Sequence, residues 1–256
     1  MSPSFSNLFV FLIGLCIGSF LNVSIHRWPL GKSIVRPPSA CPACGTPIRW
    51  HDNIPILSYI MLRGRCRDCN APIGARYPLV ELLTGLLAMA TWMRYGPGLP
   101  ALIYFGLIAA LLVISFIDYD HRIIPDFITL PGIPIGFIAT FGLPAVTWNS
   151  SLIGIAVGGG SLMAIAIGYR LLSGKNGMGG GDIKLLAMIG GFLGWQGVLF
   201  TIMTSSFLGT LVGIGVALHS GGGMKMAVPF GPFLAIGAIV YLFFGSRIIR
   251  WYFGWL

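Results

Sequence analysis

Residues 101–118 read ALIYFGLIAALLVISFID, an unbroken apolar run that ends in an acid, Asp118. A helix needs about 20 predominantly apolar residues to cross the hydrocarbon core of a bilayer, so this run predicts a membrane-spanning helix. An ionisable side chain at membrane depth is costly to desolvate and usually marks a functional site. The stretch therefore predicts the fold class, an all-α membrane protein, and also a first candidate site.

The composition of the whole chain agrees with a polytopic membrane protein. Of the 256 residues, 55% are hydrophobic and 9% are charged, and the mean hydropathy is +0.85. Soluble domains carry about 25% charged residues. The net charge of +9 suggests a nucleic-acid partner, but eight of the 16 Lys and Arg residues fall within residues 26–77, the one long polar segment. This bias favours a cytoplasmic segment beside anionic lipid headgroups, so we expect contact with membrane lipid and no nucleic acid.

About eight apolar segments are long enough to be considered as transmembrane helices. The expected spans are 8–25, 78–95, 100–117, 127–143, 151–172, 183–195, 198–217 and 228–246. The sixth is short, so we expect it to be tilted, broken or partly re-entrant. The chain divides into a first transmembrane helix (1–25), a cytoplasmic segment (26–77) and a seven-helix membrane domain (78–256).

The distribution of positive charge predicts the topology. If residues 26–77 are cytoplasmic, alternation of the spans places three more loops on the same side, namely 118–126, 173–182 and 218–227. These four regions, together with the flanking Arg170 and Lys184, hold 13 of the 16 basic residues. Because basic residues favour the cytoplasmic side, we expect the N-terminus outside and Asp118 and Asp182 near the cytoplasmic interface.

Asp182 is the second candidate acid, and it lies in residues 177–191, GMGGGDIKLLAMIGG. A pair of acids at one membrane face suits an intramembrane aspartyl protease. One carboxylate would activate a water, and the other, protonated, would donate a hydrogen bond to the scissile carbonyl. Gly179, Gly180 and Gly181 would let the backbone approach a substrate chain and adopt conformations closed to other residues. Capping of the following helix explains this glycine run equally well.

Asp118 is the best candidate among three neighbouring acids. Residues two apart point to nearly opposite faces of a helix, so Asp118 and Asp120 cannot both face one site. Asp126 is expected to cap the next helix. The alternative structural role for Asp118 is an ion pair with Arg122 or Lys184.

Four cysteines in the polar segment form two CxxC pairs: Cys41, Cys44, Cys66 and Cys69. Two such pairs separated by 21 residues are typical of a tetrahedral zinc site with four thiolate ligands. Two disulfides or a redox-active pair are the alternatives, and cytoplasmic placement disfavours stable disulfides. We expect a structural zinc ion that folds a segment too small for a core of its own.

Glu81 and Cys16 are unusual residues inside expected spans. Glu81 lies about one turn into the second span, where it would pair with Arg76 or bind a cationic ligand group. Cys16 is expected to be a small, buried, apolar residue. Close helix packing is predicted where glycines have small-xxx-small spacing, at Gly154 with Gly158 and at Gly209 with Gly213.

Six motifs, in order, resemble those of the bacterial type IV prepilin peptidases. They are GSFLNVSIHR (18–27), the two CxxC pairs, ARYPLVELLTG (75–85), IDYDHRIIPD (117–126), GMGGGDIKLLAMIGGFLGW (177–195) and PFGPFLAIG (229–237). The resemblance covers nearly the whole chain, and the chain does not depart from it at any position that the family uses for chemistry.

The resemblance implies a bifunctional enzyme of the bacterial inner membrane. Such enzymes cleave the short basic leader of type IV prepilins or pseudopilins after a glycine, on the cytoplasmic side. They then methylate the new N-terminal amine with S-adenosylmethionine, in pilus and type II secretion systems. Asp118 and Asp182 would be catalytic, Glu81 would serve methyl transfer or bind the pilin N-terminus, and the cysteines would hold zinc.

The resemblance also bears on where the methyl donor binds. The sequence carries no nucleotide-binding glycine fingerprint on a strand–helix unit, so the site must be unconventional. On the family's pattern, we expect it at the cytoplasmic face, near the cysteine segment and Glu81.

Three alternative functions use these residues differently. A peptidase without methylase activity would need only the two acids. A proton-coupled transporter would use Asp118 and Asp182 as proton relays, but these acids lie near one interface rather than at the midplane. A zinc-ribbon membrane adaptor would need neither acid.

Overall fold

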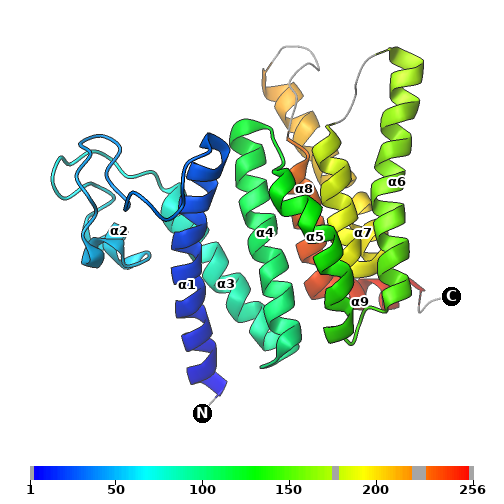
Figure 1. Cartoon of the computed structure of the whole chain (residues 1–256), viewed down its shortest axis with the longest axis horizontal. Coiled ribbons are helices and arrows are strands. Elements are labelled where there is room, and N and C mark those ends of the chain that lie inside the picture. Colours follow the sequence, from blue (N-terminus) through cyan, green and yellow to red (C-terminus); the bar gives the residue numbers. More distant parts are fainter. Residues whose placement is uncertain (1–2, 175–178, 221–228, 254–256) are drawn as a thin grey trace. The chain divides into compact units, whose positions relative to one another are not determined.

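The computed structural model describes residues 3–174, 179–220 and 229–253 (Figure 1). Within these ranges the regular elements are helices, accompanied by two isolated β-bridges and no strand. The all-α fold predicted from the sequence is confirmed. The chain divides into two compact units, Met1–Ala101 and Leu102–Leu256.

The first unit is built on two long helices that pack directly against each other. Its elements are α1 (Pro3–Arg27), η1 (Trp28–Leu30), η2 (Trp50–Asn53), α2 (Leu57–Met61) and α3 (Arg76–Tyr95). Glycines allow the close contact of α1 with α3. A Cβ on Gly14 would lie 2.8 Å from the Gly85 Cα, and one on Gly18 would lie 2.7 Å from the Glu81 Cα. Glu81 lies at this contact between α1 and α3 and is only 8% exposed.

The second unit is a helical bundle in which α7 packs against α5, α6 and α8 (Figure 1). Its elements are α4 (Leu99–His121, whose first three residues belong to the first unit), α5 (Asp126–Ala139), η3 (Thr140–Gly142), α6 (Trp148–Ser173), α7 (Gly180–Ser220), α8 (Gly231–Val240), the π-helical η4 (Tyr241–Gly245) and α9 (Ser246–Phe253). Its largest fully buried side chains come mainly from α4 and the first part of α7, among them Ile108, Ile114, Leu185 and Ile189.

Glycines also allow the backbones of α6 and α7 to pack closely against each other. A Cβ on Gly154 would lie 2.5 Å from the Gly190 carbonyl oxygen, and one on Gly158 would lie 2.5 Å from the Leu186 carbonyl oxygen. The predicted packing at Gly154 and Gly158 is therefore confirmed. The same prediction is wrong at Gly213, where a Cβ would have no neighbour within 4 Å.

Four helices in the described ranges are long and apolar enough to cross a membrane: Ser4–Leu30, Leu99–His121, Trp148–Ser173 and Gly180–Leu218. The helices α5 and α8 are apolar but shorter. The expected sixth and seventh spans both lie within α7, which is interrupted at Gly194 (φ 72°, ψ 179°). Glycine adopts this left-handed φ without the penalty that a Cβ imposes. The expected sixth span, 183–195, is thus kinked at Gly194, and it continues into the seventh span within one helix.

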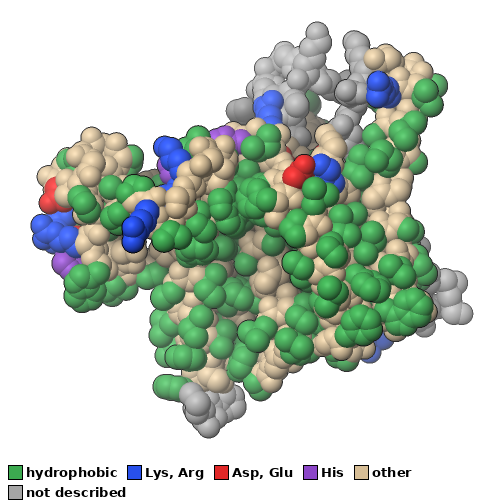
Figure 2. Space-filling view, viewed as in Figure 1, with side chains coloured by type: hydrophobic (Ala, Val, Ile, Leu, Met, Phe, Trp, Pro, Cys, Tyr) green, Lys and Arg blue, Asp and Glu red, His purple; other side chains and the backbone are tan. Residues whose placement is uncertain are grey.

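On the face shown in Figure 2, hydrophobic side chains cover much of the surface. On α6, for example, the exposed residues include Leu152, Ile153, Ile165 and Ile167. Soluble monomers rarely expose continuous apolar area on this scale, so the surface agrees with a membrane protein.

Cys16 differs from its predicted environment. Its side chain is exposed, so the expectation of a buried residue is wrong. The buried face of α1 passes through Gly14, Leu15 and Gly18, and Cys16 lies off that face.

Candidate active site and metal centre

Asp118 lies in the last turn of α4 and is 5% exposed. Its Oδ2 accepts a hydrogen bond of 2.9 Å from the amide of Gly231, the first residue of α8. Amides in the first turn of a helix have no partner within the helix and carry partial positive charge, so they stabilise a carboxylate. A Cβ on Gly231 would lie 2.7 Å from this oxygen, so glycine alone fits without a shift.

Asp182 lies in the first turn of α7, in the same unit as Asp118. The two carboxylates are close enough to interact electrostatically. The Oδ1 atom of Asp182 is buried and has no hydrogen-bond partner among the described residues. A buried carboxylate oxygen without a protein partner is available to accept a hydrogen bond from a water or a substrate group. The two predicted acids therefore lie near each other, and Asp182 keeps an acceptor oxygen without a protein partner.

The two acids that follow Asp118 in the sequence, Asp120 and Asp126, have different surroundings from it. Asp120 is exposed. Both carboxylate oxygens of Asp126 accept hydrogen bonds from Lys184 Nζ, at 2.8 and 2.7 Å. The predicted capping role of Asp126 is wrong, because Pro125 occupies the N-cap position and Asp126 is the first residue of α5. Lys184 thus pairs with Asp126 and not with Asp118.

The three glycines directly before Asp182 lie at the start of α7 and have different surroundings. A Cβ on Gly181 would lie 2.7 Å from the Ile124 Cβ, so this glycine permits close packing. A Cβ on Gly179 would lie 3.5 Å from Asp182 Oδ2, and one on Gly180 would have no neighbour within 4 Å. None of the three has a positive φ, so the expectation of conformations closed to other residues is wrong. Residues 177–178 of the motif lie outside the described ranges.

The four cysteines form a cluster that fits a metal ion. Their Sγ atoms all lie within 4.8 Å of one another, and Cys41 Sγ is 3.8 Å from Cys69 Sγ. In a tetrahedral site with Zn–S bonds of about 2.3 Å, the sulfur atoms are about 3.8 Å apart. The four thiols are free, not joined in disulfides. The cluster can therefore hold a zinc ion.

The two CxxC pairs sit in matching turns. Each turn is closed by an isolated antiparallel bridge, Ala40 with Pro47 and Arg65 with Pro72. The residue after each pair is left-handed, Gly45 with φ 72° and Asn70 with φ 56°. Glycine and asparagine tolerate this conformation best, which explains these residue types.

Local contacts prepare one of the thiols for metal binding. The Cys44 Sγ lies 3.3 Å from the Thr46 hydroxyl, and this contact together with the Thr46 backbone lowers the pKa of Cys44 to about 6. The thiolate is the form that binds a metal, so the lowered pKa favours a ligand role.

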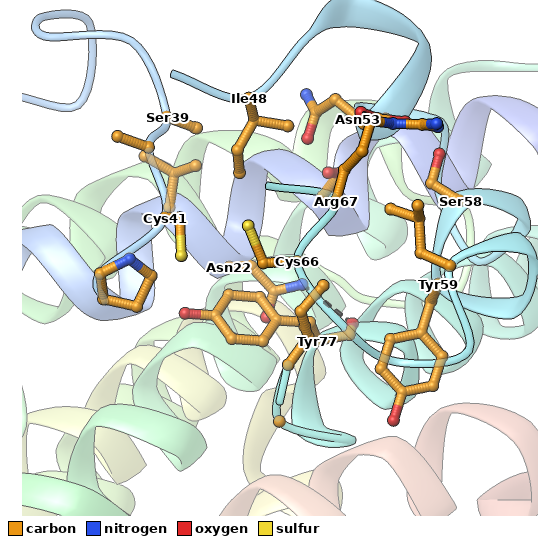
Figure 3. A pocket seen from close by; sticks show the side chains of 18 of the residues that line it. Asn22, Ser39, Cys41, Ile48, Asn53, Ser58, Tyr59, Cys66, Arg67 and Tyr77 are labelled. Atoms are coloured by element: carbon orange, nitrogen blue, oxygen red, sulfur yellow. Dashed lines mark hydrogen bonds and ion pairs between the residues drawn. The ribbon is translucent and has the colours of Figure 1, made fainter. Parts of the chain in front are cut away.

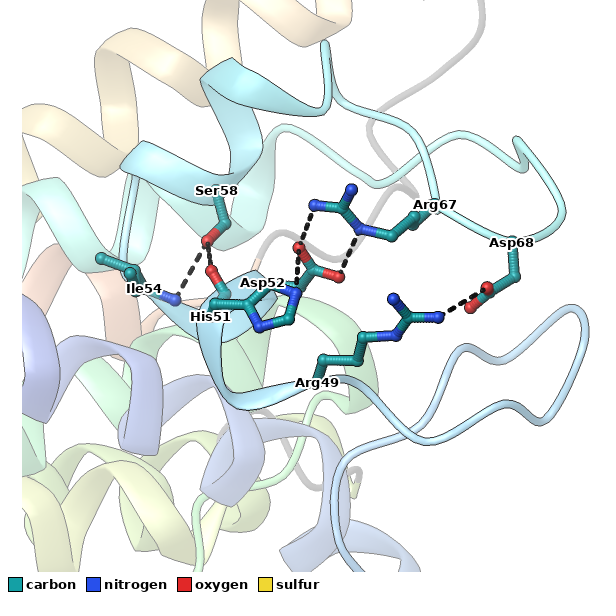
Figure 4. A network of polar contacts seen from close by, with 7 residues as sticks. All are labelled: Arg49, His51, Asp52, Ile54, Ser58, Arg67 and Asp68. Carbon is teal, nitrogen blue, oxygen red and sulfur yellow. Dashed lines mark hydrogen bonds and ion pairs between the residues drawn. The ribbon is translucent and has the colours of Figure 1, made fainter.

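Two ion pairs join the stretch that lies between the two CxxC turns to the second CxxC turn (Figure 4). The Arg67 guanidinium donates two hydrogen bonds to the Asp52 carboxylate, at 2.8 and 2.6 Å. These bonds hold the pKa of Asp52 below its usual range. Arg49 lies 3.8 Å from Asp68. Two ion pairs therefore hold the cysteine segment together in addition to the four-cysteine cluster.

Glu81 faces the cysteine segment from α3. Its Oε2 accepts a hydrogen bond of 2.8 Å from the amide of Ile56, and the side chain of Ser19 also interacts with it. Ile56 has φ 60°, which is uncommon for a β-branched residue. Glu81 also lines a cavity of about 570 Å³ within the first unit (Figure 3).

Sequence reasoning missed two backbone groups, the amides of Gly231 and Ile56. The only local signal for Gly231 is a proline directly after it, ahead of an apolar run, which is typical of a helix start. For Ile56 we find no signal in the sequence.

Two protein-family models together match most of the chain. Residues 12–95 match the Bacterial Peptidase A24 N-terminal domain, and residues 105–214 match the Type IV leader peptidase family. No solved structure matches the chain.

Several curated relatives are similar over nearly the full length. A protein of Aeromonas hydrophila named prepilin leader peptidase/N-methyltransferase is 41% identical, covering 95% of this chain and 92% of its own length. Proteins of the same name from Pseudomonas putida and Pseudomonas aeruginosa are 38% and 40% identical, and cover 97% and 94% of this chain. On this similarity the chain belongs to the type IV leader peptidase family, among the prepilin leader peptidase/N-methyltransferases.

Proposed function

We propose that this chain is a bifunctional enzyme that cleaves type IV prepilins and methylates the new N-terminus. Relatives that match 94–97% of the chain carry both activities in their name. The observation that carries the peptidase half is the pairing of two acids at the ends of different helices, Asp118 on α4 and Asp182 on α7. Substrates are prepilins or pseudopilins, cut after the glycine that ends their basic leader.

The proposed cleavage gives the two acids different roles. Two close carboxylates naturally share one proton. The Gly231 amide stabilises negative charge on Asp118, so Asp118 is the carboxylate that takes a proton from the attacking water. Asp182 is the protonated partner and donates a hydrogen bond to the scissile carbonyl oxygen. The water oxygen forms the new C–O bond, and a proton passes to the leaving amine as the C–N bond breaks.

Substrate access is supported by the start of α7. No neighbour lies within 4 Å of a Cβ placed on Gly180, two residues before Asp182, so this turn leaves room for a second chain. A helical peptide bond is shielded by its own hydrogen bonds, so the pilin must be extended at its cleavage glycine. Gly179, Gly180 and Gly181 are therefore proposed as the substrate-facing glycines.

The methyl-transfer half rests on Glu81. S-adenosylmethionine, when bound, supplies a methyl group attached to a positively charged sulfur. The first unit fits such a group, because it combines a buried carboxylate with a cavity of about 570 Å³. Glu81 would hold the pilin ammonium and take up its proton before methylation. Zinc held by the four cysteines would keep the surrounding segment folded.

We infer an eight-span topology in the bacterial inner membrane, with the N-terminus outside and residues 26–77 and the Asp pair at the cytoplasmic face. The division into residues 1–25, 26–77 and 78–256 follows from it. One support is the length of α7: its 41 residues extend for about 60 Å, twice the hydrocarbon thickness of about 30 Å. The kink at Gly194 would let this helix supply two spans. The charge bias toward the cytoplasmic loops is the second support.

Mass spectrometry of a synthetic prepilin tests both activities at once. Purified, zinc-loaded protein in detergent is incubated with the peptide, which carries Gly before Phe, and with labelled S-adenosylmethionine. We expect loss of the leader and the added mass of one methyl group on the mature chain. Cleavage without added mass would leave a peptidase alone. No cleavage by folded protein would favour the proton-coupled transporter.

A further inference from the structure

One stretch of the cysteine segment is apolar. Residues 54–62 read IPILSYIML and lie between Asn53 and Arg63. A stretch of this length is too short to cross a bilayer, and it is typical either of a buried core segment or of one that enters the membrane partway. Its middle forms α2, Leu57–Met61. The surroundings of α2 distinguish between these two possibilities.

The two faces of α2 have different surroundings. Ser58 and Tyr59 line the cavity of the first unit, and Figure 3 shows both side chains there. Leu57, Ile60 and Met61 lie outside the lining and are 50%, 64% and 72% exposed. We call these three residues the outer face of α2. The apolar side chains of a core segment would be buried, so α2 is not a core segment.

A buried serine fixes α2 beside η2. The Ser58 hydroxyl donates a hydrogen bond of 2.9 Å to the His51 carbonyl oxygen and accepts one of 3.1 Å from the Ile54 amide (Figure 4). Trp50, the first residue of η2, is 83% exposed. These bonds hold Trp50 and the outer face of α2 in one part of the molecule. Tryptophan is enriched at membrane interfaces, where its ring lies at the level of the headgroups.

Contacts with α1 and α3 place α2 beside a membrane-spanning helix. The Ile56 amide, directly before α2, is bonded to Glu81, and the Glu81 Cα lies 2.7 Å from a Cβ placed on Gly18. Gly18 is nine residues before Arg27, the last residue of α1, which corresponds to about 14 Å. The start of α2 therefore lies beside α1 and not beyond its C-terminal end, as Figure 1 also shows.

The depth of α2 follows from the length of α1. This helix is long and apolar enough to cross a membrane, and its C-terminal end is basic. With that end at the headgroups, the level of Gly18 lies within the cytoplasmic half of the hydrocarbon core, which is about 15 Å thick. An exposed apolar face at this level meets acyl chains.

Two arginines follow α2 directly. Arg63 and Arg65 are exposed, and among the residues that the structure describes neither forms an ion pair. Long basic side chains extend from a buried apolar surface to the headgroup level, where they attract anionic lipid. The outer face and these two charges together fit a leaflet that contains anionic phospholipid.

We propose that α2 is inserted into the cytoplasmic leaflet, with its outer face against acyl chains and Arg63 and Arg65 at anionic headgroups. The partner is the bilayer that α1 crosses, because α1 and α3 hold both ends of the cysteine segment at that bilayer. In this position α2 forms a wall between the cavity and the lipid. The proposal rests on the inferred topology and goes beyond the two proposed activities. Residues 26–77 are then not exposed to the cytoplasm throughout.

Photo-cross-linking tests the contact with acyl chains. p-Benzoylphenylalanine is incorporated at Ile60 of the full-length, zinc-loaded protein, in nanodiscs of phosphatidylethanolamine and phosphatidylglycerol. Illumination should join the probe to acyl chains, and mass spectrometry detects the phospholipid adducts.

Val35 is the matched control position for the probe. It is 76% exposed, and its amide donates a hydrogen bond to the Ser33 hydroxyl. The Ser33 carbonyl oxygen accepts from Arg27, so Val35 lies near the end of α1, at the headgroup level. We expect about tenfold more acyl-chain adducts at Ile60 than at Val35. Equal yields at the two positions overturn the proposal, as do adducts of Ile60 with a protein in place of lipid when the probe is activated in intact cells.

The double variant Arg63→Gln, Arg65→Gln tests the contact with headgroups. Without these substitutions, phosphatidylglycerol adducts at Ile60 should exceed that lipid's share of the bilayer about fivefold, and the double variant should return them to that share. Adducts that match the bilayer composition in both proteins overturn the headgroup contact. Zinc content and gel-filtration profile show that each protein is folded. Cleavage and methylation of a synthetic prepilin in the same nanodiscs test the proposed function separately.

Discussion

The backbone amide of Gly231 donates a hydrogen bond of 2.9 Å to Oδ2 of Asp118, across 113 positions of the chain. The start of α8 is therefore part of the surroundings of the Asp pair. Because a peptide amide cannot be protonated or rotated away like a side chain, this contact fixes one carboxylate oxygen in place. In the proposed mechanism, the second oxygen of Asp118 would contact the attacking water.

Gly231→Ala is expected to reduce prepilin cleavage strongly. The new Cβ would lie 2.7 Å from Asp118 Oδ2, so the carboxylate must move. A displacement of about 1 Å in a catalytic group can lower the rate about 100-fold, and we expect a loss in kcat of that order. Single-turnover cleavage in detergent gives this rate. Gly168→Ala is the matched control, because a Cβ there meets nothing within 4 Å. Equal rates for Gly231→Ala and the wild type would contradict the role of this contact.

The Lys184–Asp126 ion pair is expected to contribute little to the stability of the fold. Its side chains are 35% and 55% exposed, and exposed ion pairs contribute at most about 1 kcal/mol. Asp126→Asn and Lys184→Gln should lower the free energy of unfolding by no more than this and retain cleavage. Thermal unfolding and the cleavage assay check the two effects separately. Complete loss of cleavage in folded Asp126→Asn would instead place Asp126 among the catalytic acids.

Glu81→Gln is expected to reduce methylation more than cleavage. The amide keeps the size of the side chain and can still accept from the Ile56 amide, but it loses the negative charge. Mass spectrometry of the mature pilin gives the methylated and unmethylated fractions from one reaction. Equal loss of both activities would point to a shared role in substrate binding or folding.

Cys66→Ser is expected to remove the metal. A serine hydroxyl is a poor zinc ligand, and three thiolates cannot close the tetrahedral site. Zinc content should fall from about one per chain toward zero, and residues 40–72 should become more sensitive to protease. Cys16→Ser serves as the control, since Cys16 lies outside the cluster. Full zinc content in Cys66→Ser would contradict the four-cysteine site.

The helices and the metal cluster were predictable because their signals are local. Apolar runs such as residues 101–117 mark helices by composition, and the spacing of Cys41 with Cys44 and of Cys66 with Cys69 sets the turns. The glycines of the close α6–α7 contact were also visible as spacing. Each of these sequence signals is read from residues that lie a few positions apart.

The contacts that complete the sites were not predictable, because they join distant backbone segments. Every residue except proline carries a backbone amide, so no residue type in the sequence marks the amides of Gly231 and Ile56 as functional. The Lys184–Asp126 pair was missed because several acids lie near each other in sequence, and only helix packing decides which one lysine reaches. The exposure of Cys16 likewise depends on which face of α1 meets α3.

Single-turnover cleavage by Asp118→Asn and by Asp182→Asn, with the wild type and Asp126→Asn beside them, tests the central claim most directly. Asparagine preserves the shape of each side chain but can neither take up nor give the proton that the mechanism moves. We predict that both variants fold, bind zinc and insert into membranes, yet release no leader, whereas Asp126→Asn cleaves. Cleavage near the wild-type rate by either Asp118→Asn or Asp182→Asn would contradict the two-acid mechanism.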